Sequence, residues 1–212
     1  MKTILCYGDS NTWGAKPLVK LGEVGRYGLH ERWPGVLRHQ LGADYWVIEE
    51  GLNGRTTIHD DPYEPHRNGK TYLMPCLLTH APLDLVILKL GTNDLKHRFG
   101  LAPYDIATGA GALVDTIQRS QCGPEGGAPK VLLICPPVIK EIGIFADMFE
   151  GGTAKSQHLA DYYRQVAKQM QCEFFNAGAV IQVSEEEGIH YEPNTHQKLG
   201  ETVAARVKDI LG

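Results

Sequence analysis

Two continuous apolar runs constrain the fold more than any other feature of this sequence. They are LDLVILKLG at 83–91 and KVLLICPP at 130–137. A strand with one solvent-exposed face would alternate apolar and polar residues, and neither run does so. Continuous runs of this length are typical of parallel strands that helices cover on both faces. We therefore expect a buried parallel sheet.

Shorter apolar runs supply the other predicted strands, and helical patterns separate them. The strands are TILCY at 3–7, YWVIEE at 45–50 and CEFFNAG at 172–178. Apolar residues at three- and four-residue steps predict helices at 32–42, 103–120, 153–170 and 194–211. This alternation predicts an α/β fold with helices on both faces of a parallel sheet. The length of 212 residues and the lack of a flexible linker predict a single domain, 1–212, with long irregular stretches at 15–32 and 52–70.

Charge and composition exclude several classes of partner. The net charge is −4 and no run of basic residues occurs, so we expect neither nucleic acid nor an anionic membrane surface as a partner. No stretch approaches the roughly 20 apolar residues of a membrane span. The five cysteines are widely spaced without a CxxC pair, which predicts reduced thiols. With no secretory signal at the N-terminus, we expect a mature protein that starts at Met1 and is cytoplasmic.

Polar segments follow the predicted strands, where ligands gather in an open parallel sheet. They are GDSNTWG at 8–14, GLNGRTT at 51–57 and GTNDLK at 91–96, with EEGIHYEPNTH at 186–196 before the last helix. Ser10, at a strand-to-helix turn, is a candidate nucleophile, although Asp9 and Ser10 are also typical helix caps. The backbone N–H groups of Ser10 and Gly54 and the amide of Asn93 could stabilise an oxyanion. Asn93 could equally be an ordinary turn residue.

The segment before the last helix supplies a candidate base and acid. His190 could accept the Ser10 proton, and Glu187 could fold back through Gly188 to orient the imidazole. Glu185 and Glu186 are weaker candidates by spacing. We interpret His196, at the start of the last helix, as a surface residue or one that supports the site.

The four blocks GDSNTWG, LNGRTT, GTND and EGIH, in this order, resemble those of the SGNH (GDSL-type) hydrolase superfamily. The intervening segments APLDLVILKLGTNDLK and MFEGG are similar to its bacterial arylesterase and acyltransferase branch. The resemblance implies a flavodoxin-like three-layer α/β/α sandwich with a central five-stranded parallel sheet. It also implies a serine esterase without cofactor or metal, with Ser10 as nucleophile, His190 as base and Ser10, Gly54 and Asn93 as the oxyanion hole. The expected substrates are a short-chain acyl ester and a water or alcohol acceptor, and the expected assembly is a homo-oligomer.

One departure from the family pattern leaves a rival function open. The family usually has Asp where this chain has Glu187, so an impaired Glu187–His190 pair would make the protein a non-catalytic binding module derived from an esterase. A nucleotide- or flavin-binding domain lacks support, because no glycine-rich phosphate loop follows the first strand.

Two neighbouring features add further expectations about the site. Trp13 could line the acyl pocket or pack under the nucleophile turn. The small side chain of Ala15 suggests a pocket for short acyl groups. The acidic HDDPYEPH segment at 59–66 could suggest a metal, but its prolines predict an irregular loop, and we expect no metal.

Overall fold

A five-stranded parallel sheet in the order β2-β1-β3-β4-β5 forms the centre of the fold. The computed structural model describes residues 1–212 except positions 21 and 24; the predicted irregular stretch 15–32 includes these two positions, which lie outside the described residues. The strands are β1 (Lys2–Gly8), β2 (Tyr45–Gly51), β3 (Leu85–Lys89), β4 (Lys130–Cys135) and β5 (Glu173–Asn176). The predicted α/β class and sheet are confirmed, although β3 and β4 are shorter than the apolar runs that predicted them. Pro136 and Pro137 lack the N–H that would extend the β4 ladder.

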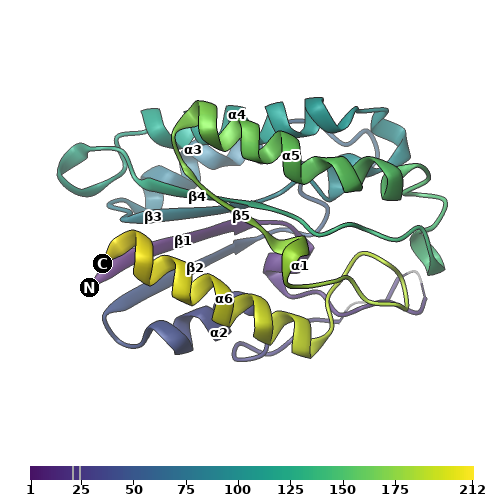
Figure 1. The fold of residues 1–212 in the computed structure, drawn as a ribbon, viewed down its shortest axis with the longest axis horizontal. Helices are drawn as coiled ribbons and strands as arrows, with labels where there is room; N and C mark the ends of the chain where they lie inside the picture. The colour runs from purple at the N-terminus through teal and green to yellow at the C-terminus, as the bar shows by residue number, and fades with distance from the viewer. Residues whose placement is uncertain (21, 24) are drawn as a thin grey trace.

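Two helical layers cover the sheet (Figure 1). One layer holds α2 (Trp33–Leu41) and α6 (Pro193–Leu211), and the other holds α3 (Gly69–His80), α4 (Pro103–Arg119) and α5 (Gly152–Met170). Successive strand side chains point to opposite faces. Ile4 and Cys6 therefore pack in the core beneath α2 and α6, while Leu5 and Tyr7 pack beneath the other layer. Both faces of β1 are buried, as its sequence predicts.

Among the described residues, helix α3 is the one long element that the sequence patterns did not predict. Its sequence GKTYLMPCLLTH contains Pro75 in the interior, which removes a backbone donor and argues against a helix. Its apolar residues also do not keep to one face. The helix forms because Leu73, Cys76 and Leu77 are buried in the core, so tertiary packing outweighs local preference.

The strand order places a switch point between β1 and β3. The order 2-1-3-4-5 is the flavodoxin-like one, in which the chain reverses direction across the sheet and leaves a crevice at the carboxyl ends of these strands. Residues following β1 and β3 must meet there. Among the described residues, every helix falls short of the length and hydropathy that a membrane span requires.

Candidate active site

Ser10 lies at the turn between β1 and the short helix α1 (Ser10–Trp13). The Asp9 carboxylate caps this helix by accepting the Asn11 N–H at 3.0 Å. Asp9 therefore serves as the cap, and the Ser10 hydroxyl is left for another partner. Only 7% of Ser10 is exposed, so the hydroxyl lies in a protected position at the sheet edge.

A chain of hydrogen bonds joins Ser10, His190 and Glu187. The Ser10 Oγ lies 3.1 Å from His190 Nε2, and His190 Nδ1 lies 2.7 Å from Glu187 Oε2. Because a carboxylate can only accept, Nδ1 carries the proton and Nε2 is free to accept from the serine hydroxyl. The three predicted residues thus come together from chain segments far apart in sequence. Neither Glu185 nor Glu186 has this contact: Glu185 is exposed and pairs with Lys140.

The Glu187 carboxylate is held in place by its second oxygen. Oε1 accepts the backbone N–H groups of Ile189, at 3.0 Å, and of His190. Glu187 is fully buried, so these bonds also compensate for the loss of hydration. Gly188 makes the turn possible: its φ is +77°, and a Cβ there would lie 2.0 Å from the Lys140 carbonyl oxygen. The longer acid thus reaches the imidazole through a tight glycine turn.

Gly54 and Asn93 line the same cavity as Ser10 and His190. The Asn93 amide donates one hydrogen to the Arg55 carbonyl at 3.1 Å. An amide nitrogen has two hydrogens, so this bond orients the group and leaves the second hydrogen for a ligand. Gly54 has a φ of +78°, a backbone conformation that side chains rarely adopt.

Side chains tie the four sequence blocks to one another. The Asn11 amide donates to the Ile189 carbonyl at 3.2 Å, which links the nucleophile turn to the histidine segment. The buried Asp94 carboxylate accepts the Thr57 N–H at 3.0 Å, which links the third block to the second. The buried Arg55 guanidinium donates to the Gly8 carbonyl at 2.9 Å. These bonds fix the positions of the loop segments that follow the strands.

The cavity beside Ser10 is small and largely apolar. Its volume is about 180 Å³, and Trp13, Ala15, Phe145, Met148 and Phe149 contribute to its walls. Trp13 thus lines the cavity, which was one of its two predicted positions, and the Arg26 guanidinium lies 4.6 Å from its ring. An apolar cavity of about 150 Å³ holds a benzene molecule, so this space suits a short acyl or small aryl group.

The acidic segment at 59–66 packs against the Asn93 block through ion pairs. Asp61 binds Lys96 at 3.3 Å and Arg98 at 3.0 Å, and Glu64 binds Lys96 at 3.2 Å. Glu64 and Lys96 both line the cavity. The acids of this segment therefore fix one wall of the cavity.

The family comparison agrees with these four blocks. The model of the GDSL-like lipase/acylhydrolase family matches residues 6–198, which include all of them. The chain belongs to this family.

Solved structures resemble this GDSL-family chain over its whole length. The native aryl esterase of M. smegmatis is 45% identical, with 100% of both chains covered and a TM-score of 0.95. A carbohydrate acetylesterase from Sinorhizobium meliloti is 42% identical, again with 100% of both chains covered and a TM-score of 0.95. An acetylxylan esterase from Xylanibacter ruminicola is 23% identical over 97% of this chain, which spans only 43% of that protein.

A buried lysine lies behind the nucleophile of this GDSL-family protein. Lys89 is fully buried, with Nζ 3.9 Å from Asp9 Oδ1 and 4.9 Å from the Tyr191 ring centre. Burial lowers the pKa of Lys89, but Tyr191 and Asp9 raise it more, so the net shift is upward. The ammonium therefore stays charged and compensates the Asp9 carboxylate. The sequence places Lys89 within a buried apolar run but does not identify Asp9 as its partner.

The position of His196 excludes one of its two predicted roles, that of a surface residue. It is fully buried rather than on the surface, and its Nδ1 accepts the Trp33 N–H at 3.2 Å. Burial, followed by the charge of Lys89, lowers the pKa of His196 to about 3. Its ring packs edge-on against Tyr27 and Tyr191. His196 is thus a neutral core residue that anchors the start of α6 to the start of α2.

Proposed function

We propose that this protein is a serine esterase that cleaves short acyl esters through an acyl-enzyme. Ser10 attacks the ester carbonyl while His190 accepts its proton through Nε2. Glu187 stabilises the imidazolium that forms. The proton then passes from His190 to the leaving alcohol, and water reverses these steps to release the acid.

The observation that carries the proposal is the chain of hydrogen bonds from Ser10 through His190 to Glu187, beside a cavity that Gly54 and Asn93 also line. The tetrahedral intermediate places negative charge on the former carbonyl oxygen. The Asn93 amide hydrogen that Arg55 leaves unused, with the N–H groups of Ser10 and Gly54, would stabilise this charge. Family membership and the likeness to an aryl esterase and an acetylesterase support the same reaction.

The cavity volume favours acetyl and other short acyl groups. A space of about 180 Å³ accommodates a few carbon atoms, so the remainder of a fatty acyl chain would extend beyond it. Acyl transfer to an alcohol, assembly as a homo-oligomer, a cytoplasmic location and the single-domain organisation stay predictions from the sequence.

The rival reading, a binding module with an impaired acid, is not favoured. It depends on a Glu187 that fails to orient His190, whereas the two side chains lie at a normal hydrogen-bond distance of 2.7 Å. A Glu187→Asp variant distinguishes the two readings. A working Glu187 predicts no gain in the rate of ester cleavage, and a decayed site predicts a large gain.

The direct test compares p-nitrophenyl esters of increasing acyl length with the wild type and Ser10→Ala. We expect cleavage to be fastest for acetate, to fall as the chain lengthens, and to be lost in Ser10→Ala. Full activity in a folded Ser10→Ala protein would exclude the proposal.

A further inference from the structure

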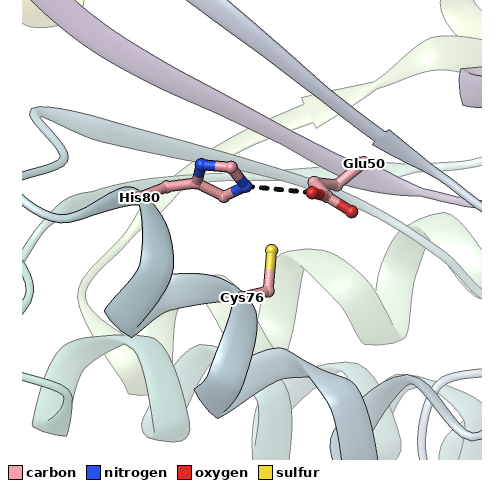
Figure 2. A group of neighbouring side chains, drawn as sticks. All are labelled: Glu50, Cys76 and His80. Carbon is pink, nitrogen blue, oxygen red and sulfur yellow. Dashed lines mark hydrogen bonds and ion pairs between the residues drawn. The ribbon is translucent and has the colours of Figure 1, made fainter.

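Three potential metal ligands meet on the far side of β2 from the α2 and α6 layer. Glu50 comes from β2, and Cys76 and His80 come from α3 (Figure 2). The carboxylate oxygen, thiol sulfur and imidazole nitrogen all lie within 4.8 Å of one another. His80 Nε2 and Glu50 Oε1 are 3.0 Å apart. We propose that these three side chains bind a borderline-soft divalent metal, of which Zn²⁺ is the best match.

The spacing of Cys76 and His80 on α3 directs both side chains toward the same point. Cys76 and His80 are four residues apart, and side chains at this spacing lie on the same face of a helix. Figure 2 shows the thiol of Cys76 directed toward the space between the His80 ring and the Glu50 carboxylate. Three different donors from two elements therefore face a common point.

The distances require only a small adjustment. Tetrahedral Zn²⁺ has bonds of about 2.3 Å to sulfur and about 2.0–2.2 Å to nitrogen or oxygen, so its ligand atoms lie roughly 3.3–3.6 Å apart. The His80–Glu50 pair is already near this range, and a small movement of the thiol completes the set. His80 and Glu50 are 25% and 21% exposed, which leaves a route for the ion and a fourth position for water.

The donor chemistry selects the class of metal. A thiolate and an imidazole bind Zn²⁺ and similar transition ions, whereas Mg²⁺ and Ca²⁺ prefer oxygen ligands. On binding, the Cys76 thiol releases its proton to solvent and the thiolate bonds to the metal. The two negative ligands then neutralise the divalent charge. The Arg55 guanidinium, a positive charge near Cys76, already donates hydrogen bonds to the Gly8 and Glu50 carbonyls.

The position of the site links it to the loop that carries Gly54. Glu50 precedes Gly54 by four residues, and the Glu50 carbonyl accepts a hydrogen bond from Arg55. A metal would fasten the end of β2 to the last turn of α3. It would be separate from the cavity that Ser10 and His190 line, because none of the three proposed ligands lines that cavity. The inference does not depend on the proposed esterase activity.

Cobalt binding to the full-length, reduced, metal-free protein tests the inference. A thiolate–Co²⁺ bond gives a charge-transfer band that nitrogen and oxygen ligands do not give, so the band reports Cys76 and not a histidine elsewhere. We expect one Co²⁺ per chain with this band, displacement by Zn²⁺, and a Zn²⁺-dependent rise in Tm. Absence of the band in the wild type would overturn the proposal.

Matched variants assign the ligands. Cys76→Ser should lose the band, while Cys172→Ser, at a half-buried cysteine outside the cluster, should keep it. His80→Gln and Glu50→Gln alter partly exposed side chains and should weaken metal binding in folded protein, whereas His39→Gln, at an exposed histidine, should not. An unchanged affinity in both His80→Gln and Glu50→Gln, or loss of the band in Cys172→Ser, would contradict the assignment even if Cys76→Ser failed to fold.

Discussion

Replacing Glu187 with Gln removes one charge at a site where the hydrogen-bond pattern dictates how the amide sits. In the wild type, Oε1 accepts two backbone N–H groups and Oε2 accepts the Nδ1–H of His190. Gln has a single oxygen. If that oxygen keeps both backbone donors, the amide NH₂ faces Nδ1 and forces the imidazole to carry its proton on Nε2. His190 could then no longer accept the proton of Ser10.

The structure also sets the expected magnitude. In the opposite orientation, the amide oxygen of the Gln side chain would accept the Nδ1–H of His190. The NH₂ group would then face two buried backbone donors, at a cost of about 1–3 kcal/mol for each unsatisfied group. Either orientation lacks the negative charge that stabilises the imidazolium. The same replacement in a serine-protease triad lowers kcat by about 10⁴-fold. We therefore expect Glu187→Gln to lower kcat by about 10³–10⁴-fold, or roughly 4–5.5 kcal/mol of barrier.

The assay compares initial rates of p-nitrophenyl acetate cleavage by the wild type, Glu187→Gln and the control Glu185→Gln. Glu185 is two residues away and exposed, so its variant should keep nearly full activity. Circular dichroism and thermal unfolding establish that both variants are folded. A folded Glu187→Gln protein within about tenfold of the wild-type kcat would refute the role given to the acid.

Three further predictions follow from the same geometry. Asn93→Ala should lower kcat by about 10²–10³-fold in a protein that circular dichroism shows to be folded, and normal kcat would remove Asn93 from the oxyanion hole. Gly188→Ala should lower the free energy of unfolding in urea by about 1–3 kcal/mol or more, because it forces a φ of +77° and a contact with the Lys140 carbonyl; equal stability would contradict this strain. His196 has a native pKa lowered to about 3, so between that pH and about 6.5 the unfolded chain binds a proton that the native protein does not, and stability rises with pH. His196→Gln should reduce this slope by up to about 1.4 kcal/mol per pH unit in urea titrations, and an unchanged slope would show that His196 titrates normally.

The strands were predictable because each contains a short apolar run, although only the central strands β1, β3 and β4 are largely buried and the edge strands β2 and β5 are partly exposed. The helices α2, α4, α5 and α6 were predictable because each has one apolar face, and their observed bounds lie within about two residues of those expected. Helix α3 was not predictable, because Pro75 and an even distribution of apolar residues hide it. Its burial depends on contacts with β1, β3 and α4 that no local pattern records.

The candidate catalytic residues were easier to predict than the buried residues that pack around them. Ser10, Gly54, Asn93 and His190 follow strands or precede the last helix, where an open α/β sheet gathers ligands. The contacts of Lys89 with Asp9 required the register of β1 and β3, which pairs Gly8 with Lys89. The buried position of His196 depended on the packing of α6 against α2.

The cluster of Glu50, Cys76 and His80 could not be predicted from the sequence either, because it also depends on tertiary packing. Its members are separated by up to 30 residues of sequence, and two of them lie on the helix that the sequence patterns did not reveal. Only the packing of α3 beside β2 brings them together. Spacing rules could have paired Cys76 with His80, but only once a helix was known to carry both.

Trapping the acyl-enzyme tests the central claim most directly. The protein would be mixed with p-nitrophenyl acetate, quenched during the first turnover, digested and measured by mass spectrometry. The account predicts an added acetyl group on the peptide that contains Ser10 in the wild type, and none in Ser10→Ala. A wild-type protein that cleaves the ester during this first turnover with no acetyl group on Ser10 would contradict it.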